Sequence, residues 1–454
     1  RDFCLSRGLG DVYKRQSSWF SNLKLRASYG MMGDDNLGGL YPDFAYLSGY
    51  TYYKGQSLMP DDPFSSVKSK KVIGSAPKGI PVTTISWMKI KLMNVGIDFG
   101  FFDNRLTGEF DLFKRMRDGI PGTPSDIMFP LETGLSALPE NMNSDMTVGF
   151  DAFVKWNDKV GDLKYSVGAN ITFARQKNGK RHGEIFGNAW DKYRWAQSNR
   201  WSNVVLNTDQ GNAGGVWMWE VIGRFETQEQ IDSYPVDQDG QNNATVRPGD
   251  VILRDVNGDG IINDFDERPQ AYASADWPWD SSTSNKNPLI SMGINLGFEW
   301  KGFDVAADFA GGFKNTFVAD WDLKWGVTRS VNGYYYNNID VWRHEDIFDP
   351  KSPWIPGKFP ALRGQESHSG RWWNSFYTRE VNYLRLRNLV VGYSLPKNWI
   401  RKVGMEQCRI YFQGTNLFCL SSLHDYGFDP EISTVNGQDY PQHKVLTLGV
   451  NVKF

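Results

Sequence analysis

The chain has 454 residues, of which 40% are hydrophobic and 15% aromatic, and its formal net charge of -2 mixes both signs, so no basic field points to a nucleic-acid partner. No run approaches the ~18 consecutive apolar residues that a membrane-spanning helix needs, and three cysteines are too few for a disulfide framework. The 46 glycines and 18 tryptophans favour an aromatic-rich, turn-rich β protein.

Residues 1–16 show neither the apolar core of a signal peptide nor a helical or strand period. We interpret this segment as a non-native leader or a sequencing scar. We therefore expect the fold to occupy residues 17–454.

The strongest pattern in the chain is alternation of apolar and polar residues in runs of about ten residues, arranged in adjacent pairs. One pair is joined at Asp103–Asn104, a second at the segment NDKVGD (157–162) and a third at Lys301–Gly302. Each pair predicts an antiparallel up-and-down hairpin.

These runs are about twice as long as the strands of a soluble β-sandwich. The segments 35–80, 178–288 and 327–375 are long, polar and rich in Gly, Asn and Trp. Long strands with short turns at one end and long loops at the other are typical of membrane barrels. The sequence therefore predicts an all-β fold, a transmembrane antiparallel up-and-down β-barrel with long extracellular loops.

Aromatic clusters in the long segments are candidate substrate-binding residues, because flat rings stack on sugars and loop residues often bind ligand. The alternative is that these rings pack loop against loop or form an interfacial aromatic girdle. The candidates are Trp190, Tyr193, Trp195, Trp201, Trp277, Trp279, Trp372 and Trp373.

The stretch DVNGDGIINDFDE (255–267) matches most of the spacing of an EF-hand calcium loop. Asp266 stands at position 12, where a sensor loop has a bidentate Glu, and neither flank is an amphipathic helix. We interpret the stretch as a lone loop stapled by a structural Ca²⁺ ion. A surface turn without an ion is the alternative. The oxygen donors are those of Asp255, Asn257, Asp259, Ile261 and, through water, Asn263, together with Asp266.

Near the C-terminus, Arg385 and Arg387 alternate with Leu384 and Leu386, which predicts that the two arginines line the interior of the barrel. The alternation changes phase at Asn388, so a β-bulge is expected there.

The chain ends on an alternating run whose apolar members would face lipid. Because the last strand of a barrel must pair with the first, this run predicts the barrel-closing terminal strand. Its apolar members are Leu446, Leu448, Val450, Val452 and Phe454.

No catalytic motif is present, and we expect no enzymatic activity. The five histidines are scattered, and there is no GxSxG, no HExxH and no phosphate-binding glycine loop. A pair of glycosidase carboxylates stays open, because its two acids need only meet in space.

Several stretches, in order, resemble the C-terminal half of SusC/RagA-type TonB-linked outer-membrane receptors. They are LKLRASYGMMGDD, NVGIDFGFFDNRLTGEFDLFKR, RPGDVILRDVNGDGIINDFDE, WKGFDVAADFAGGF, NYLRLRNLVVGYSLP, GTNLFCLSSLHDYGFDPE and the final strand.

The resemblance implies a 22-stranded barrel in the outer membrane of a Gram-negative bacterium, with the plug, the N-terminal strands and the TonB-contacting segment outside this chain. It implies energised import of a bulky nutrient, an oligosaccharide or a peptide. The implied partners are a SusD-like surface lipoprotein, the TonB complex, outer-membrane lipid and the barrel-assembly machinery acting on the terminal strand. It also places the calcium role on the loop at 255–266.

The rival interpretation is a secreted, calcium-stabilised β-sandwich that binds or cleaves glycans, in which the acidic loop would be half of a dockerin-like module. Such a module needs a second loop of the same type about twenty residues away, and none occurs. A passive porin is a weaker third possibility.

Overall fold

The fold is that of a computed structural model of the chain. The structure describes residues 19–35, 46–56, 72–77, 81–84, 86–124, 130, 137–180, 189–196, 216–271, 288–318, 340–361, 374–424, 428–431, 440 and 442–454. Residues 1–16 lie outside the described residues, as do Trp201, Trp277, Trp279, Trp372 and Trp373.

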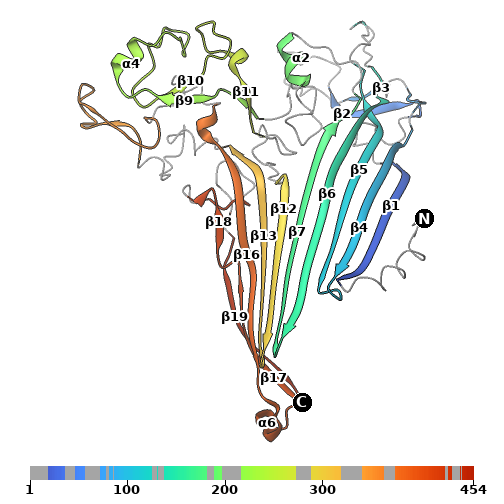
Figure 1. Cartoon of the computed structure of the whole chain (residues 1–454). Coiled ribbons are helices and arrows are strands. Elements are labelled where there is room, and N and C mark those ends of the chain that lie inside the picture. Colours follow the sequence, from blue (N-terminus) through green and yellow to red (C-terminus); the bar gives the residue numbers. More distant parts are fainter. Residues whose placement is uncertain are drawn as a thin grey trace.

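One antiparallel sheet of eleven strands dominates the described part of the chain (Figure 1). The order of neighbours is β1-β4-β5-β6-β7-β12-β13-β16-β17-β19, and β18 pairs with β16. The strands are β1 (Phe20–Asp34), β4 (Met88–Phe101), β5 (Leu106–Gly122), β6 (Glu140–Val160), β7 (Leu163–Asn178), β12 (Ile290–Trp300), β13 (Phe303–Val318), β16 (Thr378–Ser394), β17 (Gln407–Thr415), β18 (Cys419–Ser421) and β19 (Val445–Lys453).

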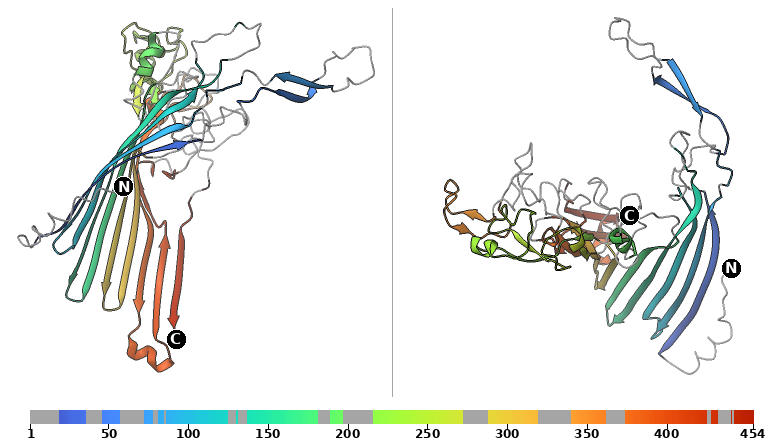
Figure 2. Two further views of the ribbon diagram at one scale, coloured as in Figure 1. Left: turned by 90° about the vertical axis from the view of Figure 1, so that its right-hand side faces the viewer. Right: turned by 90° about the horizontal axis from the view of Figure 1, so that it is seen from above.

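Each long strand therefore pairs with the next long strand along the chain, as the hairpin pattern predicts. Several strands exceed the expected ten residues, and β5 and β6 have 17 and 21 residues. A bilayer is crossed by about 9–11 tilted strand residues, so these strands also extend beyond the membrane. Figure 2 shows the sheet as a twisted, curved wall.

The turns at one end of the wall are short because their residues adopt positive φ angles. Lys301 and Gly302 have φ of 47° and 91°, as a two-residue type I′ hairpin turn requires. The predicted turn at Asp103–Asn104 is also present, with φ of 56° and 61°. The connection predicted at 157–162 is shorter than expected, since β6 continues to Val160 and only Gly161 and Asp162 make the turn.

Many apolar side chains of the wall are exposed on one surface of the sheet. We call this surface the apolar face, and its members are exposed by 37% at Val391 and up to 81% at Leu448. A soluble sheet would cover such a face, because burial of apolar area stabilises a fold by roughly 25 cal/mol per Å². It carries Leu25, Val95, Leu112, Val154, Val167, Phe298, Val391, Ile410 and Leu448.

Aromatic rings gather on the apolar face where the short turns begin. Trp300 and Phe303 are about half exposed, and Phe303 packs against Tyr393 with ring centroids 4.4 Å apart. Trp19 stacks on Phe101 at 5.5 Å. Such a row of rings is typical of the aromatic girdle that membrane barrels place at the lipid–water interface.

Among the described residues, no second sheet packs face to face on this wall, so the architecture is that of a barrel wall and not of a β-sandwich. Within the same part of the chain, every helix is too short or too polar to cross a bilayer.

The described parts of the long connections lie at the end of the wall opposite the short turns and contain small elements of their own (Figure 1). They include described parts of 123–139 and 416–444, which the sequence pattern did not single out. The elements are β2 (Tyr50–Gln56), β3 (Val72–Pro77), α2 (Ala189–Ala196), β8 (Val216–Met218), β9 (Val221–Arg224), α4 (Gln228–Asp232), β10 (Val251–Leu253), η3 (Asp264–Asp266), β11 (Arg268–Ala271), β14 (Arg343–His344), β15 (Trp354–Ile355) and η6 (Ser375–Tyr377).

One connection at the turn end is an exception, because it forms a short helical segment between β16 and β17. Its elements are α6 (Lys397–Ile400) and η7 (Arg401–Val403).

Candidate functional site

The face opposite the apolar face carries charged side chains that pair with one another across strands. We call it the polar face. Arg26 donates from Nε to Asp98 Oδ1 at 2.8 Å and from Nη2 to Asp111 Oδ2 at 2.7 Å. Arg117 and Asp145 form a further pair, in which Asp145 is buried. A surface that would otherwise present isolated charges is therefore internally neutralised, as suits a hydrophilic passage.

Two ion pairs on the polar face join strands that are not neighbours, and in both cases the strand between them contributes a glycine. Arg26 on β1 reaches Asp111 on β5 across Gly96 of β4. Arg409 on β17 reaches Asp304 on β13 across β16, with Nε 2.9 Å from Oδ1. A Cβ atom on Gly392 of β16 would stand 2.5 Å from Arg409 Nη2 and 2.6 Å from Asp304 Oδ1. Because these glycines have no side chain, the charged groups can contact each other directly above the backbone of the middle strand.

Replacing Gly392 by alanine should displace this pair and lower the free energy of unfolding by about 1 kcal/mol, the worth of a partly exposed ion pair. The matched control is Gly168→Ala on the same face, where an added Cβ would meet nothing closer than 3.9 Å. The midpoint of thermal unfolding of each variant, measured on semi-native gels, checks both substitutions. Equal midpoints for the two variants would contradict the role of the glycine.

A chain of amide and carboxylate groups crosses the same face between β12 and β17. Asn295 Nδ2 donates to Asp308 Oδ1 at 2.7 Å, Asn388 Nδ2 lies 3.5 Å from Asp308 Oδ2, and Gln413 Nε2 donates to Asn388 Oδ1 at 3.1 Å. These bonds tie four neighbouring strands together. The wall is thus braced on its polar side.

The predicted bulge on β16 is confirmed at Asn388. Asp308 pairs with Asn388 and the next residue, Phe309, pairs with Leu386, so Arg387 is the extra residue. Leu386 pairs with Phe309 and is buried, whereas Arg385 and Arg387 point to the polar face as predicted.

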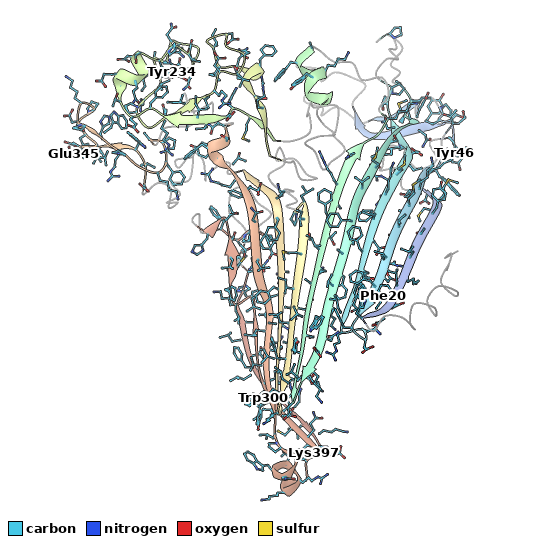
Figure 3. All side chains as sticks on the ribbon, in the orientation of Figure 1. Phe20, Tyr46, Tyr234, Trp300, Glu345 and Lys397 are labelled. Carbon is cyan, nitrogen blue, oxygen red and sulfur yellow. The ribbon has the colours of Figure 1, made fainter. Side chains whose placement is uncertain are left out.

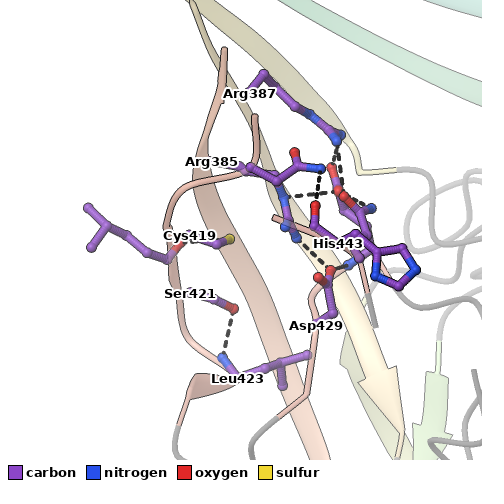
Figure 4. A network of polar contacts seen from close by, with 11 residues as sticks. Arg385, Arg387, Cys419, Ser421, Leu423, Asp429 and His443 are labelled. Carbon is purple, nitrogen blue, oxygen red and sulfur yellow. Dashed lines mark hydrogen bonds and ion pairs between the residues drawn. The ribbon is translucent and has the colours of Figure 1, made fainter. Parts of the chain in front are cut away.

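The two arginines hold the 428–431 segment against the wall (Figure 4). Arg385 Nη2 donates to Asp429 Oδ1 at 2.6 Å, and its Nε lies 3.1 Å from Glu431 Oε2. Arg387 pairs with Glu431 and with Gln442. The side chain of Arg385 is 5% exposed and those of Asp429 and Glu431 are 14% and 13% exposed, so this charge network is screened from water.

A small apolar core lies beside this network and fixes the same connection. Phe317, Val381 and Leu423 are buried together, and Tyr383 and Phe428 pack against them. Leu423 N also donates to Ser421 Oγ at 3.0 Å (Figure 4). The part of 416–444 that the structure describes is therefore a fixed lining of the polar face at its loop end.

Residues 216–271 and 340–361 come from two different connections and form one folded unit, which we call the loop module. Its buried apolar residues include Phe225, Ile231 and Val246 from the first connection and Val341 and Trp342 from the second. Arg224 Nη1 donates to the Gly357 carbonyl at 3.0 Å and joins the two. A core of this kind gives the module a fixed shape.

The loop module is attached to the wall at the start of β16. Ser375 N donates to the Trp219 carbonyl at 2.9 Å, and Val221 N donates to Ser375 Oγ at 2.9 Å. The module therefore stands in a defined position at the loop end of the wall, as Figure 3 shows with its side chains drawn.

The loop at 255–266 lies in this module and has the backbone turns of a cation-binding loop. Asp255 accepts hydrogen bonds from Gly258 N at 2.7 Å and Gly260 N at 2.9 Å, and Asp259 Oδ1 accepts one from Ile261 N at 2.9 Å. Gly258 and Gly260 have φ of 75° and 81°. The Ile261 N–H lowers the pKa of the Asp259 carboxyl, so this group stays ionised into the acidic range.

Asp266 closes the loop from inside. It is completely buried, and its oxygens accept hydrogen bonds from Val256 N at 2.9 Å and Asn263 N at 2.8 Å. Asp266, at position 12, thus connects the two ends of the loop through hydrogen bonds.

The donor set suits calcium only in part. Carboxylate and amide oxygens are the ligands that Ca²⁺ prefers, but Asn257 Nδ2 donates to Asp259 Oδ2 at 2.9 Å and turns an N–H group towards the acid. Within the described residues, no three His, Cys, Asp or Glu side chains are grouped to hold a metal ion. Calcium binding stays a prediction.

A second aspartate-rich turn lies beside this loop, although the sequence analysis did not single it out. Asp237 N donates to the Gly260 carbonyl at 2.9 Å, and Ile262 N donates to the Asp237 carbonyl at 3.0 Å. Asp239 accepts hydrogen bonds from Gln241, Asn243 and Thr245. Its sequence DQDGQNNAT (237–245) lacks the spacing of a calcium loop, so the pairing appears only in three dimensions.

The structure brings two of the candidate aromatic residues together with two that were not predicted. Trp190 and Tyr193 of α2 stack at 5.4 Å, and Trp190 meets the ring of Phe265 at 5.6 Å. The Arg268 guanidinium lies 5.3 Å from the Trp190 ring. Tyr193 and Phe265 are 46% and 51% exposed. Trp195 is also in α2, and its side chain lies outside what the structure describes.

The terminal strand β19 forms one edge of the sheet, as its alternation predicts. It pairs with β17 from Gln407↔Lys453 to Thr415↔Val445. Leu448 pairs with Phe412 and Val450 with Ile410, so the register continues the apolar face onto β19. The predicted apolar members are all exposed: Leu446, Leu448, Val450, Val452 and Phe454. Pairing of this edge with a first strand stays a prediction.

No protein-family model matches the chain. Among curated proteins, the TonB-dependent receptor SusC of Bacteroides thetaiotaomicron is 23% identical over 446 residues, which are 96% of this chain and 38% of the relative. The TonB-dependent receptor P39 of Formosa agariphila is 22% identical over 495 residues, 97% of this chain and 41% of the relative. The chain thus spans about two fifths of the length of the curated relatives that it matches.

Solved structures of the RagAB peptide importer have the same fold. In its open-open state the match covers 100% of this chain and 42% of the neighbour, with a TM-score of 0.64 and 19% identity. In the closed-closed state the match covers 100% and 43%, with a TM-score of 0.61 and 20% identity.

The resemblance to SusC/RagA-type receptors is therefore confirmed, and so are the membrane-barrel fold and the outer-membrane location in a Gram-negative bacterium. The relatives are receptors and transporters by name. The total of 22 strands and the domain boundaries stay predictions.

Proposed function

We propose that this chain is the C-terminal part of the barrel of a TonB-dependent transporter, which imports an oligosaccharide or a peptide together with a SusD-like surface lipoprotein. The supporting observation is the reversed polarity of the wall. Apolar side chains are exposed on one face and charged side chains neutralise one another on the other. A wall of this kind suits lipid outside and a polar solute inside.

The rest of the transporter lies, in this proposal, in the part of the gene product that corresponds to the remaining length of the relatives. It comprises further strands that pair with the edges at β1 and β19, a plug and the segment that contacts TonB. An unpaired strand edge is costly in lipid, so the wall needs those strands. The barrel-assembly machinery would act on β19.

The nutrient would first meet the loop end of the wall. The rings of Tyr193 and Phe265, each about half exposed, offer flat apolar surfaces beside the Arg268 cation. Such a surface can stack on a sugar ring or on a peptide side chain. The packing of Trp190 between them favours a supporting role for that ring. No step of the proposal involves a bond made or broken, so the activity is transport without catalysis.

Deletion of the gene in its own host tests the proposal. We expect loss of growth on one class among a panel of oligosaccharides and oligopeptides, and the same loss when TonB is inactivated. Uptake that survives without TonB would identify a passive porin instead. Growth that is unchanged on the whole panel would overturn the transport function.

We also propose that the loop at 255–266 binds one structural Ca²⁺ ion, with Asn257 turning its carbonyl oxygen inward. The affinity would fall in the range of extracellular sites, roughly 10⁻⁴ to 10⁻³ M. Millimolar Ca²⁺ should slow proteolytic cleavage within the loop of the purified receptor, and Asp259→Asn should abolish this protection.

The matched control for the calcium test is Asp264→Asn, because Asp264 is exposed and lies outside the predicted ligand set. It should retain the protection. If neither the parent nor the control responds to Ca²⁺, the loop is held by its own N–H bonds alone and the alternative of a turn without an ion stands.

A further inference from the structure

The β14–β15 hairpin ends in two neighbouring apolar side chains, and contact with lipid does not explain their exposure. Ile347 is 72% and Phe348 is 88% exposed. Exposed apolar residues such as Val95 and Leu448 lie on the membrane-facing strands, whereas this tip belongs to the loop module. In Figure 3 the nearby Glu345 marks its place at the outer margin of that module. Adjacent exposed apolar side chains away from a membrane commonly mark a protein contact.

The tip is held in one conformation by hydrogen bonds on both sides of the apolar pair. Phe348 N donates to Asp346 Oδ1 at 2.9 Å, and Lys351 N donates to Asp349 Oδ1 at 2.9 Å. Ser352 Oγ donates to the Asp346 carbonyl at 3.0 Å. An anchor that is already ordered loses little conformational entropy when it binds.

The base of the hairpin joins this tip rigidly to the loop module. The His344 and Trp354 rings lie 3.9 Å apart, and His344 Nδ1 is 2.7 Å from the Ser352 carbonyl. Trp342 is buried, and its backbone N donates to the Phe359 carbonyl at 2.9 Å. Since the module is fixed to β16, the tip has a defined place relative to the wall.

Three carboxylates flank the apolar pair. Glu345, Asp346 and Asp349 are exposed on the tip, and the exposed cations of the hairpin are Lys351 beside the tip and Arg343 at its base. Carboxylates do not enter hydrocarbon without a large cost, so insertion into lipid is disfavoured. A small solute is bound by a concave site, and this feature protrudes. The complementary surface is a protein pocket that is apolar at its centre and rimmed by Lys or Arg.

We propose that Phe348 and Ile347 are the anchor by which the receptor holds its surface lipoprotein, inserted into an apolar pocket with a basic rim on that subunit. The assignment rests on the proposed function, which supplies the partner. The new element is the point of contact. The ring of Phe348 and the aliphatic chain of Ile347 would fill the centre of the pocket, and the three carboxylates of the tip would contact its rim.

The test measures binding of the lipoprotein to the detergent-solubilised receptor produced from its native gene. Phe348→Asp should weaken binding by about tenfold or more, because a central aromatic anchor commonly accounts for that much. Asp349→Lys should slow association at low salt and lose this effect at high salt. Ile222→Asp is the matched control, since Ile222 is a 51% exposed apolar residue of the same module away from the tip, and its affinity should equal that of the parent.

Three results would overturn the proposal. Parental affinity in Phe348→Asp shows that the tip is not the anchor, although the transporter assignment stands if the complex still imports nutrient. Loss of receptor self-association with intact lipoprotein binding assigns the tip to a second copy of the receptor. Absence of any lipoprotein complex with the parent receptor removes the partner, and with it both this inference and that part of the proposed function.

Discussion

Replacement of Arg385 by methionine should destabilise the protein by about 3–5 kcal/mol, the usual cost of removing one member of a buried charge network. Methionine fills a similar volume but leaves Asp429 and Glu431 without their shared cation. Both carboxylates are largely buried, so Asp429 would lose its cation and Glu431 would keep only the partly exposed Arg387. The melting midpoint on semi-native gels should fall, and cleavage within 416–444 should become faster.

Two control variants distinguish the effect of breaking the Arg385 network from the effect of removing any charged side chain. Lys164→Met breaks an ion pair with Glu299 in which both side chains are 63% exposed, and the stability change should stay within about 0.5 kcal/mol. Adding Asp429→Asn to Arg385→Met should recover part of the lost stability, because the buried carboxylate that lost its cation is gone. An effect of Arg385→Met no larger than that of Lys164→Met would contradict the importance of the network.

Replacement of Val95 by arginine should reduce the amount of assembled protein in the outer membrane. Val95 is 60% exposed on the apolar face, midway between the aromatic turn end and the charged Lys91. A cationic side chain at the middle of the lipid-facing band costs about 2–4 kcal/mol. The measured quantity is the fraction of the protein that is folded in the membrane rather than degraded.

The adjacent variant Asn94→Arg is the matched control, because residue 94 lies on the same strand and points to the polar face. Assembly should be close to that of the parent. In a water-soluble sheet the order would be reversed, since an exposed valine tolerates arginine better than a half-buried asparagine does. Equal assembly of the two variants would therefore count against a lipid-facing surface.

The sequence by itself determined the strands, their faces and the short turns. Alternation with a period of two assigns Val95 and Asn94 to opposite faces without any knowledge of neighbours, because successive side chains of a strand point in opposite directions. The phase change at Asn388 predicted the bulge for the same reason. The acidic loop was recognisable because its turns depend on nearby Asp, Asn and Gly residues.

The tertiary structure alone decided which of those side chains meet. The pairing of Arg26 with Asp111 crosses 85 positions of sequence, and it depends on Gly96 standing between them. The Arg385 network, the loop module and the contact of Phe265 with Trp190 join segments that share no local pattern. Contacts of this kind are set by register and by packing in space, and neither quantity is encoded in the periodicity of a single strand.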